Sequence, residues 1–256
     1  LLEASGRPLD AWLAEARRGK AFYLSTGWYA ELAVPSEQRV GVPVRNVIGY
    51  WPGVELTANS QVVMVTAYYD GLGRFPDGTL YPGANDNASG VATMLEMIRT
   101  LKEEGFKPKR TLFFVAWIGG ERHRPLDFSY FLRAGRGFEE FKIVAALELE
   151  GVGAGTGSSA VAWHSTRERL TEVVQRAARQ VHTPLTTKAR GLHADSTLWS
   201  DVMVKDVPAL TLSWVGSDDL AHRPSDTPEN IDPQKLEQVG RLSTLALMIL
   251  ANDLSY

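Results

Sequence analysis

The 256-residue chain contains no cysteine, so it has neither a disulfide framework nor a metal site with thiolate ligands. It has no uninterrupted run of 18 apolar residues, and we therefore expect no membrane-spanning helix within it. Its net charge of −3 is small, which predicts neither a nucleic acid nor an anionic membrane surface as a partner.

The composition that remains is that of a globular protein. Apolar residues make up 44% and charged residues 22%, and the length suits one large domain with a substantial core. Apolar runs alternate with segments of helical periodicity, which predicts an α/β fold with three layers (α/β/α) around a mostly parallel, mixed and twisted sheet. Strands are expected near residues 38–51, 61–67, 111–117, 143–149, 159–163 and 208–214, and helices near 9–18, 87–104, 126–134, 166–180 and 233–253.

The N-terminal part of the chain differs from the rest. The sequence begins at Leu1 and shows no signal sequence, which indicates a piece of a longer protein. We expect residues 1–40 to form a helix and a linker segment, and residues 41–256 to form the main domain.

The most informative stretch is Tyr81–Gly90, which runs directly into an amphipathic helix. Asp86 stands at the helix start, where the helix dipole and free backbone N–H groups favour a carboxylate. This position suits a capping residue, and it equally suits a metal ligand of fixed orientation.

Other polar residues follow the predicted strands at the points where the strands end. Because ligands of parallel sheets bind beyond the carboxyl ends of the strands, these residues are expected to converge. They are Tyr68, Asp70, Glu121, Glu150 and His222.

Together these motifs resemble the di-zinc aminopeptidases, a family that includes bacterial leucyl aminopeptidases and the ectodomains of glutamate carboxypeptidase and the transferrin receptor. The resemblance runs from about residue 45 to the C-terminus, and residues 1–40 resemble the segment that follows a protease-associated insert in larger members. It implies a zinc-exopeptidase fold. The blocks that carry it, in the family's order, are Arg45–Gly53, Val62–Asp70, Tyr81–Gly90, Thr111–Glu121, Ile143–Gly153 and Pro208–Asp232.

The resemblance also implies roles for the strand-end residues. One metal would take Asp86, Glu121 and His222, all of which are suitable ligands. The second metal would share Asp86 and take the residues at positions 68 and 150, where the family has His and Asp and this chain has Tyr68 and Glu150.

The general base of the family is a glutamate at the position of Gly120, and Asp70 matches the carboxylate that orients the missing histidine. A phenol must lose a proton with a pKa near 10 before it binds zinc, so Tyr68 is a poor ligand. Loss of a positioned base costs about 10²–10⁴ in rate. Asp70 is then expected to have a structural role.

The remaining half-site of two carboxylates and one histidine suits a single zinc ion, as in the related glutaminyl cyclases. The sequence leaves open whether the site holds one zinc or none, and His222 as a hydrogen-bonded loop residue is the simpler alternative. If the alignment of the loop with the family motif is shifted by one residue, Glu121 becomes the base and His123 becomes a ligand.

The rim of the cleft would be basic, although such a rim is often only solvated. Its basic residues are Arg122, His123, Arg124 and Arg223.

Three functions follow for this degenerate site. The first is a domain without di-zinc peptidase activity that serves as a binding or structural module for a peptide or protein ligand. The second is a single-metal hydrolase that uses Asp86, Glu121 and His222, with Glu150 or a substrate group as base. The third is an active aminopeptidase with the shifted register.

By analogy with the family, the parent protein is expected to be extracytoplasmic or membrane-anchored.

Overall fold

The computed structural model describes residues 6–19, 29, 31, 33, 43–122, 140–164, 168–189 and 207–256. The chain divides into two units, Leu1–Pro43 and Val44–Tyr256. The first unit contains helix α1 (Leu9–Arg17), as the sequence predicts, and none of its residues is buried. An ion pair of 2.9 Å between Arg7 and Glu15 lies along this helix.

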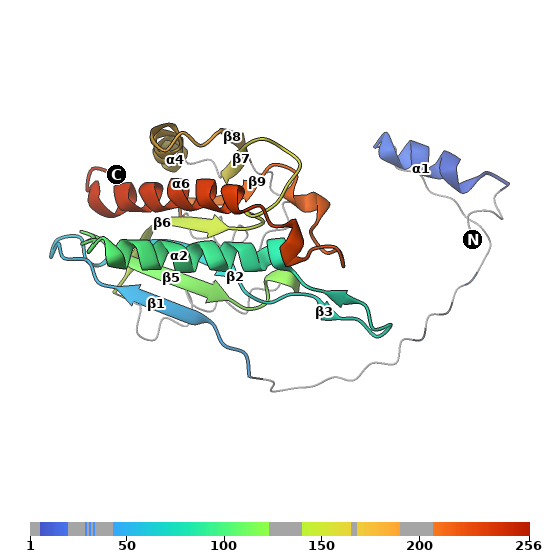
Figure 1. Cartoon of the computed structure of the whole chain (residues 1–256), viewed down its shortest axis with the longest axis horizontal. Helices are drawn as coiled ribbons and strands as arrows, with labels where there is room; N and C mark the ends of the chain where they lie inside the picture. The colour runs from blue at the N-terminus through green and yellow to red at the C-terminus, as the bar shows by residue number, and fades with distance from the viewer. Residues whose placement is uncertain are drawn as a thin grey trace. The chain divides into compact units, whose positions relative to one another are not determined.

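The second unit is built on a seven-stranded sheet with the order β1-β5-β2-β6-β9-β7-β8 (Figure 1). Strand β1 pairs antiparallel with β5, β7 pairs antiparallel with β9, and the other neighbours are parallel. The predicted mixed, mostly parallel sheet is therefore confirmed. The strands are β1 (Val47–Trp51), β2 (Gln61–Tyr68), β5 (Thr111–Trp117), β6 (Lys142–Leu149), β7 (Ala160–His164), β8 (Leu185–Ala189) and β9 (Ala209–Trp214).

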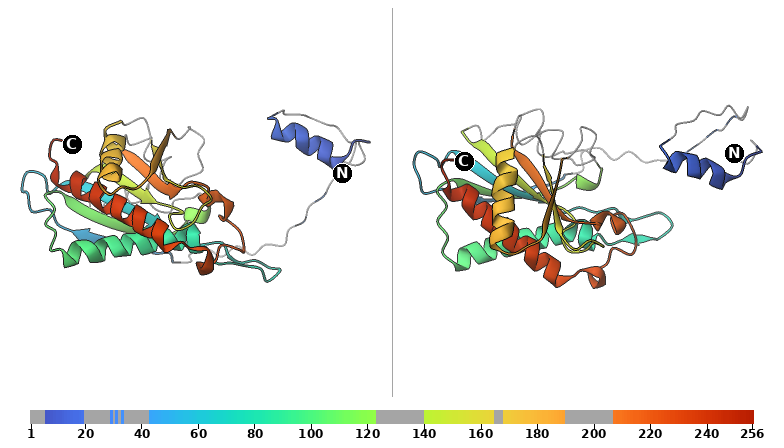
Figure 2. Two further views of the ribbon diagram at one scale, coloured as in Figure 1. Left: turned by 45° about the horizontal axis from the view of Figure 1, so that its top comes forward. Right: turned by 90° about the horizontal axis from the view of Figure 1, so that it is seen from above.

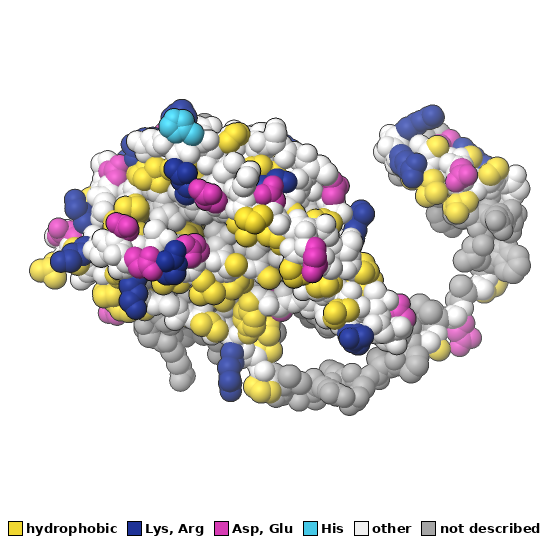
Figure 3. Space-filling view, in the orientation of Figure 1, with side chains coloured by type: hydrophobic (Ala, Val, Ile, Leu, Met, Phe, Trp, Pro, Cys, Tyr) yellow, Lys and Arg dark blue, Asp and Glu magenta, His cyan; other side chains and the backbone are white. Residues whose placement is uncertain are grey.

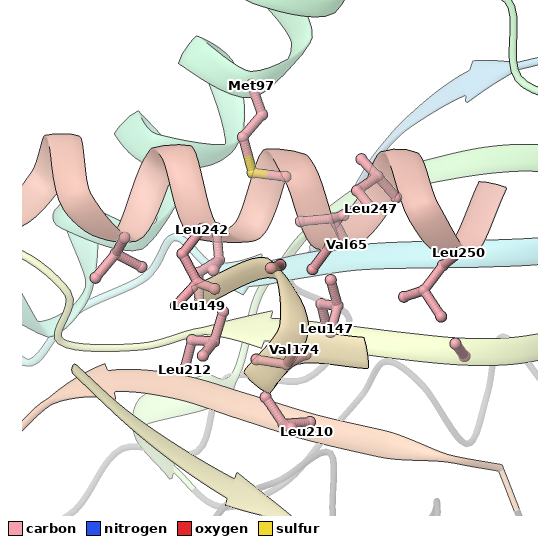
Figure 4. Packing of buried hydrophobic residues seen from close by; sticks show 14 of the residues in the cluster. Val65, Met97, Leu147, Leu149, Val174, Leu210, Leu212, Leu242, Leu247 and Leu250 are labelled. Carbon is pink, nitrogen blue, oxygen red and sulfur yellow. The ribbon is translucent and has the colours of Figure 1, made fainter. Parts of the chain in front are cut away.

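Helices α2 (Ser89–Glu103), α4 (Glu168–Gln180) and α6 (Pro233–Asn252) pack on one face of this sheet. Helix α6 lies beside α2, and Figure 2 shows α4 crossing α6. Apolar residues of the inner strands interdigitate with the helices, as the close view in Figure 4 shows for Met97, Val65 and Leu147. The predicted helix at 126–134 lies outside the described residues.

The opposite face of the sheet carries a second apolar cluster that includes Met64, Tyr68, Phe113 and Trp117. Successive residues of a strand point to opposite faces, so Tyr68 belongs to this face, whereas Ala67 belongs to the helix side. The site at the strand ends is therefore assembled at the edge of the second cluster.

Apolar side chains also gather on the outside of the helix layer, as Figure 3 shows. A groove of about 570 Å³ lies between α2 and α6 and is lined by residues such as Met97, Leu245 and Met248. It shares no lining residue with the cavity around Asp86. None of the helices in the described ranges is long and apolar enough to cross a membrane.

Arg110 fixes the amino end of β5 to the end of α6. Its side chain is 1% exposed and donates to the carbonyl oxygens of Leu250 at 2.6 Å and Asp253 at 2.7 Å. Its Nε atom donates to the Gln61 side chain at 2.7 Å. A buried guanidinium is stable only when most of its five N–H donors have partners, and a further bond to the Tyr256 carbonyl oxygen at 3.4 Å brings the number of contacts to four.

We predict that Arg110→Met lowers the free energy of unfolding by about 2–4 kcal/mol, because it leaves buried carbonyl groups without donors. Urea denaturation measures this change. Arg99→Met is the matched control, since Arg99 pairs with Glu96 and Glu103 on the exposed face of α2. Equal effects of the two substitutions would contradict the role assigned to Arg110.

Candidate metal site

Asp86 lies in a short turn, Ala84–Ala88, that leads into α2 and whose backbone is non-helical at Asp86 and Asn87. Its peptide bond to Asn87 is cis. The turn packs tightly against the carboxyl end of β6, where the Asn87 side chain donates to the carbonyl oxygen of Leu149 at 2.8 Å. A Cβ atom at Gly90 would overlap this same carbonyl oxygen, so the glycine is required for the close approach.

The structure brings the three predicted ligands together. The Nε2 atom of His222 lies 3.0 Å from Glu121 Oε2 and 3.5 Å from Asp86 Oδ2. One ligand atom from each residue falls within 4.8 Å of the other two. Asp86 and Glu121 are buried, whereas the His222 side chain is 53% exposed, so the site is approached from the His222 side.

The donor set fits a zinc ion. Two carboxylates and one imidazole are the ligands of many single-zinc sites that keep an open position. Glu121 Oε2 is buried, and although His222 Nε2 lies 3.0 Å away, the two atoms do not form a hydrogen bond, nor does any other described donor bond to this oxygen. A buried carboxylate oxygen without a donor is costly, and a bound cation would satisfy it.

The electrostatics of the site agree with this assignment. Burial raises the pKa of Glu121 to about 8, and the nearby carboxylates of Asp86, Asp70 and Asp226 add to the shift. Burial also raises the pKa of Asp86, against the opposing effects of the Tyr68 hydrogen bond and of His222. Without a cation the two carboxylates resist ionising together, so metal binding would release protons.

The second metal position of the family pattern is changed. The Tyr68 hydroxyl donates a hydrogen bond to Asp86 Oδ1, which leaves Oδ2 facing His222. Burial and the charges of Glu150 and Asp86 raise the pKa of Tyr68 far above its ordinary range. Tyr68 is therefore a neutral donor to Asp86. Glu150, at the end of β6, is half-buried and is not part of the three-ligand cluster.

Tyr68 also occupies the space next to position 120, where the family has its general base. A Cβ atom at Gly120 would lie 2.5 Å from Tyr68 Cβ and would overlap the Tyr68 ring. The ring and any side chain at position 120 therefore exclude each other. Asp70 accepts a hydrogen bond from the Gly120 backbone N–H at 3.1 Å, which gives it the structural role expected for it.

The basic rim is described only in part. Arg223 lines the small cavity beside the three ligands, together with Leu72, Tyr81 and Gly83. His123, Arg124 and the side chain of Arg122 lie outside the described residues, so the shifted register with His123 stays a prediction.

Two supports of the site were not predicted from the sequence. Asp226 accepts hydrogen bonds from the backbone of Asn85 and Asp86, and the Asn85 side chain accepts from Gly153 and Ala154 at 2.8 Å. The only sequence signal for them was that both residues lie within motifs of the family resemblance.

Comparisons with known proteins reveal a family relationship. Residues 46–247 match Peptidase family M28. The chain is 25% identical to human transferrin receptor protein 2 over 92% of its own length and 31% of the relative, and 26% identical to aminopeptidase YwaD of Bacillus subtilis over 73% and 40%. It thus spans about a third of the length of these relatives.

Solved structures show the same fold. LapB from Legionella pneumophila aligns with a TM-score of 0.65 and 20% identity, over 80% of this chain and 55% of LapB. The aminopeptidase of Aneurinibacillus sp. strain AM-1 aligns with a TM-score of 0.64 and 22% identity, over 81% and 48%.

We predict that Gly120→Ala destabilises the domain by about 1–3 kcal/mol because the new methyl group overlaps the Tyr68 ring. In a Tyr68→Gly background, which removes every Tyr68 atom that the new methyl group would overlap, the same substitution should cost much less, and urea denaturation of the four proteins measures the coupling. Gly71→Ala is the control, because nothing lies within 4 Å of a Cβ atom there. Additive effects of the two substitutions would show that the ring and position 120 do not compete.

The raised pKa of Glu121 predicts a pH dependence of the metal-free protein. Its folded pKa is about 8 and its ordinary value is 4.5, so the folded state binds more protons between these values. This contribution to stability is complete below pH 4.5 and is lost as the pH rises through 8. Chelator-treated Glu121→Gln should therefore lose less stability than the wild type between pH 5 and 8 in urea titrations. Parallel curves would refute the shift.

Proposed function

Since the chain belongs to Peptidase family M28, we propose that it is a member without two-metal peptidase activity that holds one zinc ion and serves as a binding module. Asp86, Glu121 and His222 would hold the ion. The observation that carries the proposal is that the Tyr68 hydroxyl donates to one oxygen of Asp86, while position 120, where the family has its base, is a glycine packed against the Tyr68 side chain.

The missing base and the altered second metal position lie side by side in the structure, at Gly120 and Tyr68. Tyr68 replaces a ligand, and its hydroxyl takes the Asp86 oxygen that would face the second metal. The same side chain excludes any residue larger than glycine at position 120. A base supplies about 10²–10⁴ in rate, so peptide hydrolysis by the family's two-metal route would be reduced by at least that factor.

The retained residues support binding at this site. A zinc ion held there would act as a Lewis acid with an open coordination position. Asp86 and Glu121 are buried below it, while His222 stands at the solvent edge with Arg223 beside it in the cavity lining. A peptide or protein ligand would therefore approach over His222 and Arg223 with a group that binds metal, such as a carboxylate.

The relatives point to both a binding and an enzymatic role. One is named as a receptor, human transferrin receptor protein 2, and one as an aminopeptidase, YwaD. The departures at Tyr68 and Gly120 favour the binding role for this chain. An extracytoplasmic location of the parent protein stays an expectation by analogy.

A single-metal hydrolase is the second candidate. It is favoured by the buried Glu121 oxygen, which forms no hydrogen bond with the described residues and would be satisfied by a bound cation. Glu150 follows β6 at the strand ends, and its charge helps to raise the pKa of Tyr68, so it is the candidate base for this function. Activity that is lost in Glu150→Gln would identify this function.

The proposal is tested by zinc content and hydrolysis measured on the same preparation. After zinc loading and desalting, elemental analysis should find one zinc per chain in the wild type and none in Asp86→Ala. Leucine p-nitroanilide should be cleaved at least about 100-fold more slowly than by an active family member assayed alongside.

The matched variant is Tyr68→His with Gly120→Glu, which removes the tyrosine hydroxyl from Asp86 and restores the histidine and the base of the family pattern together. It should bind a second zinc ion, since the histidine and Glu150 would then complete the second ligand set. Two zinc ions in the wild type, or hydrolysis at the rate of the active enzyme, would overturn the proposal.

A further inference from the structure

We propose that Asp226 is a positioning residue that assembles the metal site by fixing the loop of one ligand to the loop of another. This inference rests on the proposed zinc site. Asp226 is not one of the three ligands, and its side chain is directed to the backbone that carries Asp86.

The contact is a clamp with three hydrogen bonds from consecutive residues. The N–H of Asn85 donates to Asp226 Oδ1 at 2.7 Å, and the N–H of Asp86 donates to Oδ2 at 2.9 Å. The N–H of Ala84 donates to the Asp226 carbonyl oxygen at 3.2 Å. Hydrogen bonds to an ionised carboxylate are about twice as strong as neutral ones, so this clamp orients the Asp86 backbone firmly.

The Asp226 carboxylate is buried, so the backbone N–H groups take the place of the hydrogen bonds that water would otherwise donate to it. Asp226 is 1% exposed, and no salt bridge to it occurs among the residues that the structure describes. A buried charge without hydrogen bonds would be strongly unfavourable. The two backbone N–H groups therefore hold Asp226 in place as much as Asp226 holds the Asp86 loop.

The same residue closes the loop that carries His222. The N–H of Asp226 donates to the Arg223 carbonyl oxygen at 3.0 Å, which makes a turn directly after His222. His222 itself has a φ of +58°, a left-handed conformation that a non-glycine residue keeps only when its surroundings impose it. Asp226 thus links the backbones of two ligands that lie far apart in the sequence.

This linkage predicts an effect on metal affinity. Residues that orient metal ligands change affinity by about 10–100-fold when they are replaced. Asp226→Asn keeps the shape but offers one acceptor oxygen, and its NH₂ group must oppose one of the two backbone N–H groups. Zinc affinity should therefore fall by about 10–100-fold, although all three ligands are retained.

The experiment compares Asp226→Asn with Asp232→Asn on the full chain. Asp232 also accepts from a backbone N–H, that of Gln234 at 2.9 Å, but it caps α6. Zinc dissociation constants are measured by competition with a fluorescent chelator, and amide hydrogen exchange at Asn85 and Asp86 is measured in the zinc-free proteins.

We expect Asp226→Asn to weaken zinc binding about 10–100-fold and to speed exchange at both amides. Asp232→Asn should leave zinc affinity within about twofold and the two amides unchanged. If the wild type binds zinc and Asp226→Asn binds it equally well, the clamp is refuted and the zinc site stands. If the wild type binds no zinc, the proposed site is refuted and the positioning role with it.

Discussion

The contact between the Tyr68 ring and the Gly120 backbone is the constraint on which the chemistry of this domain depends. The ring occupies the only space for a side chain at position 120, and its hydroxyl donates to one oxygen of Asp86. Tyr68 thus affects the second metal position and the base position of the family site, and leaves the three-ligand position of Asp86, Glu121 and His222 in place. Asp86 Oδ2 faces His222 in the cluster with Glu121, while the other oxygen of Asp86 accepts the hydrogen bond from Tyr68.

The site residues gather at one edge of the sheet because its central strands are parallel. Tyr68 ends β2, Glu121 follows β5, Glu150 follows β6 and His222 follows β9, so all four meet at one edge. The helix start at Asp86 is drawn to the same edge by close packing on Leu149 at the end of β6. The core on the helix side holds the strands in register, and the loops beyond them are free to vary in chemistry.

Much of this could be predicted from the sequence, for physical reasons that also explain the omissions. Strands β2, β5, β6 and β9 are buried and read as continuous apolar runs. Strand β8 was missed because it is an exposed edge strand with the sequence Leu185–Ala189, in which two threonines and a lysine break the pattern. Asp86, Glu121 and His222 were found because each lies in a motif. The overlap of Tyr68 with Gly120 and the clamp by Asp226 are contacts between distant segments, which no local pattern reveals.

The central claim is that this site holds one metal ion, on the His222 side of Asp86. The most direct measurement is an anomalous difference map from zinc-loaded crystals, collected on both sides of the zinc absorption edge. The account predicts one peak, bounded by Asp86 Oδ2, Glu121 and His222, with the Tyr68 hydroxyl still bonded to Asp86 Oδ1. A second peak between Asp86 and Glu150, with the Tyr68 ring displaced, would contradict it.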